Sequence, residues 1–306
     1  MGGFVFCLLI FVLFYYIIFL DMIKLRVYAK LNLALNVLSC EQDGYHQLDM
    51  VNQSISLFDE IRIVPRPDDR ISVNCDKNIG VINTALSSAS EFAKTFGTCG
   101  CDITIKKGIP MKGGLGGSSA DAAGVLVALA KLHDIPLQKV FPIAEKVGSD
   151  VKYMMTGGLA RVGGKGEQVL SKNSDSLIYY VVVMPEFGLS TRKVFECFDQ
   201  NPDFVFADND KLVNAVEKED LKGIRDNMRN GLQQTAFDIE PKLKQIFNDV
   251  SQFGKVCMTG SGSCLFLVAD TLTDGEYISR KICEMNYNAV LVESRAFGVE
   301  FLEFKN

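Results

Sequence analysis

Apolar residues recur along the chain in two spacings, and together they predict a mixed α and β protein. Alternating or continuous apolar runs rich in β-branched residues indicate strands, in residues 25–37, 49–57, 61–73, 101–106, 158–169, 177–184, 256–266 and 288–292. Apolar positions spaced three and four apart indicate helices, in residues 80–96, 122–132, 136–147, 209–253 and 274–284. Another helix is expected to begin at Thr191, whose hydroxyl can cap it.

A glycine-rich stretch lies where a predicted strand passes into a predicted helix. Residues 110–123 read PMKGGLGGSSADAA, with four glycines and two serines. Glycine lets backbone N–H groups approach a ligand closely, and the first turn of a helix presents unpaired N–H groups at the positive end of its dipole. Such a loop suits phosphate, although glycines in tight turns often serve no ligand.

Two common nucleotide-binding loops do not fit this stretch. A P-loop needs Gly-x4-Gly-Lys-Ser/Thr, whereas Lys112 precedes the glycines. The dinucleotide fingerprint belongs to the first strand of a βαβ unit, whereas this stretch begins near residue 110, after a β-rich opening.

Polar side chains stand out at three other places. Lys30 and Asn32 lie two apart in the first predicted strand, so their side chains point to one side of it. Tyr45 and His46 follow an Asp-Gly turn, and Asp150 follows a Gly-Ser bend. Each also has an ordinary interpretation: a solvated strand face, an exposed turn and a helix cap.

Composition excludes several classes of protein. The chain has 306 residues, 48% of them hydrophobic and 23% charged, as in an ordinary globular protein. Its net charge of -5 and the absence of a long basic run argue against nucleic-acid binding. The nine cysteines are scattered and the histidines number only two, so a zinc site is not expected; the cysteines are typical of small buried groups in a reducing compartment.

The first residues form an apolar run of marginal length for a membrane span. Residues 3–20 (GFVFCLLIFVLFYYIIFL) carry no charge. No Lys or Arg precedes the run and no small-residue cleavage site follows it, which argues against a signal peptide. Met22 precedes an ordinary beginning, so a spurious upstream start is favoured over an anchor. Lys24 and Arg26 follow the run, so even an anchored chain would keep its body in the cytoplasm.

The glycine-rich stretch resembles the phosphate-binding motif of the GHMP small-molecule kinases. Residues 256–266 (VCMTGSGSCLF) resemble the third motif of the same superfamily. Residues 29–33 (AKLNL), 43–48 (DGYHQL) and 147–151 (VGSDV) resemble, in order and spacing, the branch that phosphorylates a cytidine diphosphate conjugate of methylerythritol in the non-mevalonate isoprenoid pathway. The resemblance extends from residue 24 to about residue 296.

The resemblance implies an α+β fold with two lobes and an ATP cleft between a β-rich N-terminal lobe and a C-terminal lobe of sheet and helices. We expect domains at residues 22–170 and 171–306, with residues 1–21 outside both. The implied cofactors are ATP and Mg²⁺, with Ser118 or Ser119 assisting the metal and no other metal ligand predicted. The implied ATP contacts are Pro110, Met111, Lys112, Gly113, Gly114, Leu115, Gly116, Gly117, Ser118, Ser119 and Ala120.

The resemblance also implies the residues around the acceptor. Asp150 would orient or deprotonate the acceptor hydroxyl, and Lys30 would keep Asp150 ionised and offset the charge of the moving phosphoryl group. Substrate contacts are implied for Asn32, Tyr45, His46 and Phe195, with Tyr45 and His46 at the cytidine end. The oligomeric state is not predicted, and a membrane partner is expected only if residues 3–20 are an anchor.

Departures from the family pattern and two rival functions remain. Lys152 replaces the usual proline, and Ser118 and Ala120 replace a glycine and a serine of the usual loop. A kinase of the same superfamily for mevalonate or homoserine is one rival, and the segment 43–48 argues against it. A non-catalytic regulator is the other, and the retention of Lys30 and Asp150 argues against that.

Overall fold

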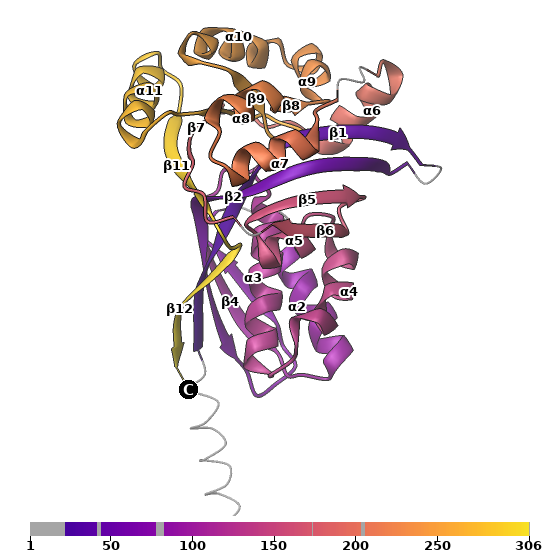
Figure 1. Ribbon diagram of the computed structural model, residues 1–306. Coiled ribbons are helices and arrows are strands. Elements are labelled where there is room, and N and C mark those ends of the chain that lie inside the picture. The colour runs from indigo at the N-terminus through magenta and orange to yellow at the C-terminus, as the bar shows by residue number, and fades with distance from the viewer. Residues whose placement is uncertain (1–21, 42–43, 78–82, 173, 203–205, 306) are drawn as a thin grey trace, which may run out of the picture.

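The computed structural model describes residues 22–41, 44–77, 83–172, 174–202 and 206–305, which form an α+β fold of two lobes (Figure 1). The strands are β1 Met22–Cys40, β2 His46–Pro65, β3 Ser72–Cys75, β4 Cys101–Lys106, β5 Leu159–Gly164, β6 Gln168–Lys172, β7 Tyr179–Val183, β8 Arg229–Asn230, β9 Val256–Met258, β10 Leu265–Val268, β11 Ala289–Arg295 and β12 Val299–Lys305. The helices are α2 Thr84–Phe96, α3 Gly117–Leu132, α4 Leu137–Val147, α5 Val151–Thr156, α6 Thr191–Gln200, α7 Asn209–Glu217, α8 Leu221–Asn227, α9 Gln233–Ile239, α10 Pro241–Val250 and α11 Leu272–Glu284, with a 3-10 turn at Ser251–Phe253.

The long antiparallel strands β1 and β2 run from the lower lobe of Figure 1 up to the elements of the upper lobe. The main sheet has the order β12-β1-β2-β11-β7-β10-β9. β2 pairs with β4 along Glu60–Pro65 and with β5 along Leu48–Gln53, so different halves of one strand serve different neighbours. The two strands therefore join both lobes into one framework.

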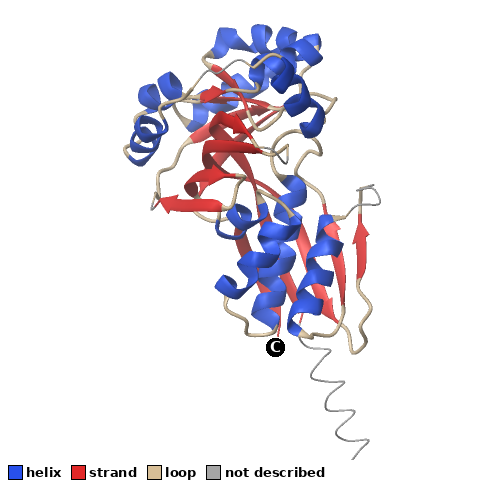
Figure 2. Ribbon diagram, turned by 90° about the vertical axis from the view of Figure 1, so that its right-hand side faces the viewer, coloured by secondary structure: helices blue, strands red, loops and turns tan. Residues whose placement is uncertain are grey.

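The lower lobe places α2, α3, α4 and α5 together on its sheet (Figure 2). Helix α3 is built largely from alanine, valine and leucine and is buried along most of its length. Gly124 allows the close approach, because a Cβ there would lie 2.3 Å from Val27 Cγ1 and 2.9 Å from Ile61 Cδ1. The N-terminus of α3, which follows the glycine-rich loop, is thus fixed against β1 and β2.

The upper lobe is an antiparallel sheet, β11-β7-β10-β9, with α6 to α11 around it. Its central strand β7 is almost entirely apolar and buried, with Tyr180 edge-on to Phe266 of β10 at 6.2 Å between ring centroids. The loop between β9 and β10 points toward the lower lobe, where it contacts the glycine-rich loop.

Most predicted elements are confirmed, with β4 found at the predicted residues and α4 within one residue of them. The prediction for the end of the chain was incomplete, because the strand expected at residues 288–292 is followed by a further strand, β12. The prediction of short strands in residues 61–73 was wrong in part, because residues up to Pro65 continue β2. The helix α5 was not predicted, and α3 begins at Gly117 rather than at residue 122.

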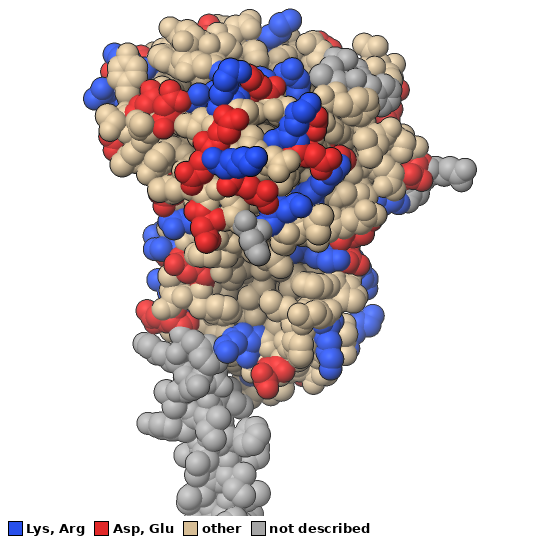
Figure 3. Space-filling view, viewed as in Figure 1, with Lys and Arg blue, Asp and Glu red and all other residues tan. Residues whose placement is uncertain are grey.

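The expectation for residues 3–20 lies outside the described residues. None of the helices in the described part of the chain combines the length and apolarity that crossing a membrane requires. On the face shown in Figure 3, Lys and Arg side chains are interspersed with Asp and Glu, so that face carries no large area of a single charge.

Candidate active site

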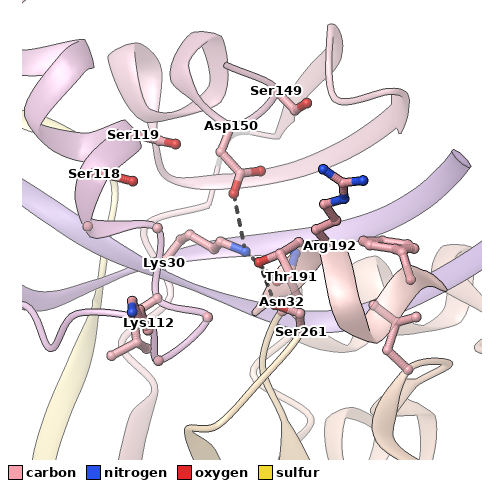
Figure 4. Close-up of a pocket in the computed structure, with 18 of the residues that line it drawn as sticks. Lys30, Asn32, Lys112, Ser118, Ser119, Ser149, Asp150, Thr191, Arg192 and Ser261 are labelled. Carbon is pink, nitrogen blue, oxygen red and sulfur yellow. Dashed lines mark hydrogen bonds and ion pairs between the residues drawn. The ribbon is translucent and has the colours of Figure 1, made fainter. Parts of the chain in front are cut away.

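A cavity of about 1360 Å³ lies where the two lobes meet. Its walls come from β1, from the loop before α3, from the start of α5, from α6 and from the loop after β9 (Figure 4). It is large enough for two substrates, because one drug-sized ligand fills roughly 300–1,000 Å³.

The glycine-rich loop ends at the N-terminus of α3, at one end of this cavity. Of its eleven predicted ATP contacts, all but Ala120 line the cavity, whereas Ala120 is buried inside the lobe. Gly116 stands at the N-cap with φ 74° and no side-chain cap. The backbone N–H groups of Gly117, Ser118 and Ser119 precede the first intrahelical hydrogen bond, which Ala120 donates to Gly116, and so are available to an anion.

The loop between β9 and β10 braces the glycine-rich loop from the upper lobe. Gly114 has φ 77°, and a Cβ there would lie 2.2 Å from the carbonyl oxygen of Thr259. The backbone N–H of Cys264 donates to the carbonyl of Gly113 at 3.1 Å. Only glycine permits this contact between lobes, which explains the residue type that the sequence pattern contained.

Lys30 and Asp150 face each other inside the cavity (Figure 4). The Lys30 side chain is only 4% exposed, and its Nζ lies 3.5 Å from Asp150 Oδ2 and donates to Asn32 Oδ1. Asp150 stands at the N-cap of α5 but makes no capping hydrogen bond. The interpretations of Lys30 as part of a solvated face and of Asp150 as a helix cap were therefore wrong.

Strand β1 fixes these side chains relative to both loops through its backbone. The N–H of Lys30 donates to the carbonyl of Leu115 at 3.1 Å, and the N–H of Asn32 donates to Thr259 Oγ1 at 2.9 Å. The Asn32 amide is itself held, since its Nδ2 donates to Asn52 Oδ1 at 2.6 Å. The position of Lys30 is thus set by the main chain, as a preorganised site requires.

Tyr45, His46 and Phe195, the predicted contacts of the cytidine end, line the cavity together. Asn32 lines it too, but lies beside Lys30. The rings of His46 and Phe195 pack with centroids 4.5 Å apart and planes inclined by 30°. Tyr45 is 57% exposed, and Lys165 Nζ lies 4.9 Å from the centroid of its ring. An aromatic wall with one hydrogen-bonding imidazole suits a flat heterocycle.

Helix α6 has a different cap from the one predicted, and it contributes a cationic residue to the cavity. The cap of α6 is Ser190, whose hydroxyl accepts from the N–H of Lys193, so the prediction of Thr191 as the cap was wrong. The Thr191 hydroxyl instead hydrogen-bonds Ser261 Oγ at 2.8 Å, which ties α6 to the loop after β9. Arg192, whose exposed side chain pairs with Glu196 at 2.7 Å, also lines the cavity, and no sequence pattern singled it out.

A buried ionic group that the sequence analysis missed supports the glycine-rich loop from below. Lys107 Nζ lies 2.5 Å from Asp59 Oδ2 and 2.6 Å from Asp121 Oδ2. Asp59 Oδ1 accepts from the N–H groups of Gly108 and Ile109, at 2.6 and 2.8 Å. Asp121, which ends the Ser-Ser-x-Asp part of the motif, could have indicated this group, because a charged residue within an apolar helical run needs a partner of opposite charge.

Burial dominates the ionisation of this group. It raises the pKa of Asp121 to about 7, against the opposing effect of Lys107. Burial alone would lower the pKa of Lys107, but its two carboxylate neighbours outweigh burial and raise it. Asp121 Oδ1 is buried without a hydrogen-bond partner among the described residues. The group is therefore sensitive to pH near neutrality.

Family models match both lobes of the chain. The model for the GHMP kinases N terminal domain matches residues 83–162, and the model for the GHMP kinases C terminal matches residues 212–288. The first match contains the glycine-rich loop and Asp150, and the second contains the loop between β9 and β10.

Curated relatives and solved structures extend the similarity over most of the chain. The 4-diphosphocytidyl-2-C-methyl-D-erythritol kinase of Clostridium beijerinckii is 32% identical over 81% of this chain and 91% of its own length. That of Clostridium perfringens is 34% identical over 81% and 89%. A crystal structure of 4-(cytidine 5'-diphospho)-2C-methyl-D-erythritol kinase matches with TM-score 0.75 and 26% identity, covering 89% of this chain and 98% of that one. The crystal structure of homoserine kinase from Cytophaga hutchinsonii shares the fold, with a TM-score of 0.73 and 16% identity. The match covers 92% of this chain and 98% of that one.

Proposed function

The chain belongs to the GHMP kinases, and among them to the 4-diphosphocytidyl-2-C-methyl-D-erythritol kinases, and we propose how its residues carry out the phosphoryl transfer that these kinases catalyse. The enzyme is an ATP-dependent kinase of the isoprenoid pathway, and it transfers the γ-phosphoryl group of ATP to the 2-hydroxyl of the cytidyl substrate. A bond forms between the acceptor oxygen and the γ-phosphorus, the bond from that phosphorus to ADP breaks, and the hydroxyl proton must be accepted. The chain therefore has to bind two anionic substrates, align them and accept one proton.

Asp150 is the proton acceptor in our proposal. Its carboxylate faces the cavity and makes no cap hydrogen bond, so its oxygens are available to an acceptor hydroxyl. Phosphoryl transfer through a loose transition state needs alignment of the nucleophile more than a strong base. Orientation of the hydroxyl is thus the first contribution of Asp150, and removal of the proton as the bond forms is the second.

Lys30 supplies positive charge at the point of transfer. It is buried, and its ammonium lies between Asp150 and Asn32. A fixed ammonium in a site shielded from water stabilises both the Asp150 carboxylate and the charge on the equatorial oxygens of the phosphoryl group. The pair of the buried Lys30 and the partly exposed Asp150, facing the glycine-rich loop, is the observation that carries the proposal.

The glycine-rich loop holds the nucleotide phosphates in this scheme. The N–H groups at the start of α3 would donate to phosphate oxygens, aided by the helix dipole. The lobes contact each other at Gly113 and Gly114, and this contact holds the two loops side by side. Tyr45, His46 and Phe195 would then hold the cytidine end, with Asn32 between the two regions.

The cavity also fits Mg²⁺. This ion prefers oxygen ligands and binds nucleotide phosphates together with one or two protein oxygens and several waters. The hydroxyls of Ser118 and Ser119 line the cavity beside the predicted phosphate site and would hold the ion. When bound, Mg²⁺ neutralises charge on the phosphate oxygens.

An assay of ADP release tests the proposal. The purified chain receives ATP, Mg²⁺ and one acceptor at a time: the cytidyl substrate, mevalonate or homoserine. We expect turnover with the cytidyl substrate alone, and a kcat lower by about 10²–10⁴ in Asp150→Asn. Asp175→Asn, an exposed aspartate outside the cavity, is the matched control and should leave kcat unchanged.

Other outcomes would change the assignment. Turnover with mevalonate or homoserine alone would keep the kinase and replace the acceptor. Unchanged kcat in Asp150→Asn would overturn the role of that residue. The domain boundary at residue 170 and a cytoplasmic location stay predictions, and comparing residues 22–306 with the full chain in the same assay would show whether residues 1–21 matter for turnover.

A further inference from the structure

A thiol, an imidazole and a carboxylate meet at the acceptor end of the cavity. Cys40 lies at the end of β1, His46 at the beginning of β2 and Asp199 near the end of α6. His46 Nε2 lies 2.7 Å from Asp199 Oδ1, and Cys40 Sγ lies 3.9 Å from Asp199 Oδ2. The ligand atoms of the three residues all lie within 4.8 Å of one another. The two strand ends of one hairpin and a helix more than 150 residues away in sequence thus converge on one point.

These distances are close to those of a tetrahedral zinc site. With Zn–S of about 2.3 Å and Zn–N or Zn–O of about 2.0–2.1 Å, neighbouring ligand atoms are separated by roughly 3.3–3.6 Å. The pair His46–Asp199 is shorter than this and the pair Cys40–Asp199 slightly longer. The third pair, Cys40–His46, lies within 4.8 Å, so side-chain shifts of up to about one ångström would bring the three atoms to these separations.

The surroundings favour a built site over a chance cluster. His46 is 8% exposed and Phe195 packs against its ring, so the imidazole is already oriented. Cys40 is exposed and Asp199 is partly exposed, which leaves a path for an ion from solvent. Thiolate and imidazole together select Zn²⁺ over the hard ion Mg²⁺.

We propose that Cys40, His46 and Asp199 form a second cation site, for Zn²⁺ or a similar soft divalent ion, separate from the phosphate loop. Its three ligands link the β1–β2 hairpin to α6. The count of two histidines in the sequence argued against zinc, but the fold places one of them beside a thiol and a carboxylate.

Occupancy would also affect the acceptor, and this part rests on the proposed function. His46 and Asp199 both line the cavity that we assign to the cytidine end. An ion on them removes the imidazole nitrogen and the carboxylate oxygen from any contact with a nucleobase. The site is therefore expected to oppose binding of a cytidine diphosphate group.

Binding of Co²⁺ to the full chain, without nucleotide or Mg²⁺, tests the site directly. A thiolate ligand gives Co²⁺ an intense charge-transfer absorption in the near ultraviolet. We expect one Co²⁺ per chain with this absorption, displaced by Zn²⁺, and a rise in Tm with Zn²⁺. Cys40→Ser should abolish the absorption, and Asp199→Asn should weaken binding by tenfold or more. Cys99→Ser, another exposed cysteine, is the matched control and should retain it.

Two results would overturn the site: no charge-transfer absorption in the wild-type chain, or an absorption that persists in Cys40→Ser. The acceptor part is tested with CDP as the probe. Zn²⁺ should weaken CDP binding by tenfold or more in the wild type and not in Cys40→Ser, and equal CDP affinity with and without Zn²⁺ would overturn that part. Failure of CDP to bind at all, with a normal Co²⁺ spectrum, would count against the proposed function alone.

Discussion

Lys30 is a charged side chain that the fold keeps out of water. Its Nζ has Asp150 and Asn32 as partners, and the backbone of β1 fixes its position. Sequence spacing predicted that Lys30 and Asn32 share a side of one strand. The spacing could not predict that this side is buried, because an exposed strand shows the same alternation. The strand is covered by loops that lie more than 80 residues away in sequence, such as the loop that contains Leu115.

Replacement of Lys30 by methionine should remove charge while keeping length. We expect Lys30→Met to fold and to lower kcat by about 10²–10³, because a preorganised charge at the transferring group is lost. Steady-state kinetics and a thermal melt check this. Lys24→Met, in the same strand but partly exposed and paired with Glu60, is the control. A normal kcat in Lys30→Met would remove this residue from the mechanism.

Asp121 should give the stability of the protein a particular dependence on pH. Burial raises its pKa to about 7 in the folded protein, whereas an unfolded chain has a value of about 4. The folded state holds this proton more tightly, so the contribution of Asp121 to the free energy of unfolding falls as pH rises from about 4 to about 7. Denaturant unfolding at several pH values should show the wild type losing stability relative to Asp121→Asn across that range. Parallel curves would contradict the assigned pKa, and Asp175→Asn serves as the reference.

At the scale of elements, the loops at the cavity depend on glycines that tolerate no side chain. Gly114 and Gly97 both have positive φ, 77° and 66°, but only Gly114 faces another backbone, whereas a Cβ at Gly97 would meet nothing within 4 Å. The pair therefore separates the cost of backbone conformation from the cost of the clash.

Gly114→Ala should weaken ATP binding, and Gly97→Ala should not. Both variants should lose about 1 kcal/mol of stability from the left-handed backbone. We expect Gly114→Ala to raise the Kd for ATP by tenfold or more, because the loop must move away from Thr259. Isothermal titration with ATP and a denaturant midpoint for each variant measure the two effects. Equal ATP affinity in both variants would show that the contact between lobes does not shape the nucleotide site.

Elements with a strong local signal could be predicted, and those defined by contacts could not. β4 and α4 were predicted correctly, because the alternation of a strand and the three-four spacing of a helix can be recognised within a few residues of sequence. Ser190 and Thr191 are both good caps; in the fold Ser190 caps α6, while the Thr191 hydroxyl bonds Ser261, a residue 70 positions away. The pairing of Cys40 with Asp199 likewise depends on α6 reaching the hairpin, which no local pattern encodes.

At the scale of the whole molecule, the first strand of the N-terminal part pairs with strands from the C-terminal part of the sequence. β1 pairs with β12, and a short parallel pairing joins it to β8. Both partners lie beyond residue 170, outside the predicted N-terminal domain. Topology of this kind arises from long-range pairing and is the part of a fold that single-sequence reasoning reaches least.

A fragment of residues 22–170 should therefore fail to fold by itself. It would leave the edge of β1 without β12 and remove Glu300, which accepts from Tyr28 at 2.6 Å. We expect the fragment to lack near-ultraviolet circular dichroism, and co-expression with residues 171–306 to restore a folded complex. Cooperative unfolding of the isolated fragment, with a midpoint close to that of residues 22–306, would show that the predicted boundary separates independent units.

The pairing of β1 with β12 also has a consequence for folding during synthesis on the ribosome. Met22 pairs with Lys305, so the sheet that carries Lys30 acquires its edge strand only when the last strand of the chain has emerged. Contacts so distant in sequence form slowly, and an unpaired strand edge is prone to aggregation while it waits. The lobe that is synthesised first is therefore completed late, and a translating chain should depend on chaperones until β12 has emerged.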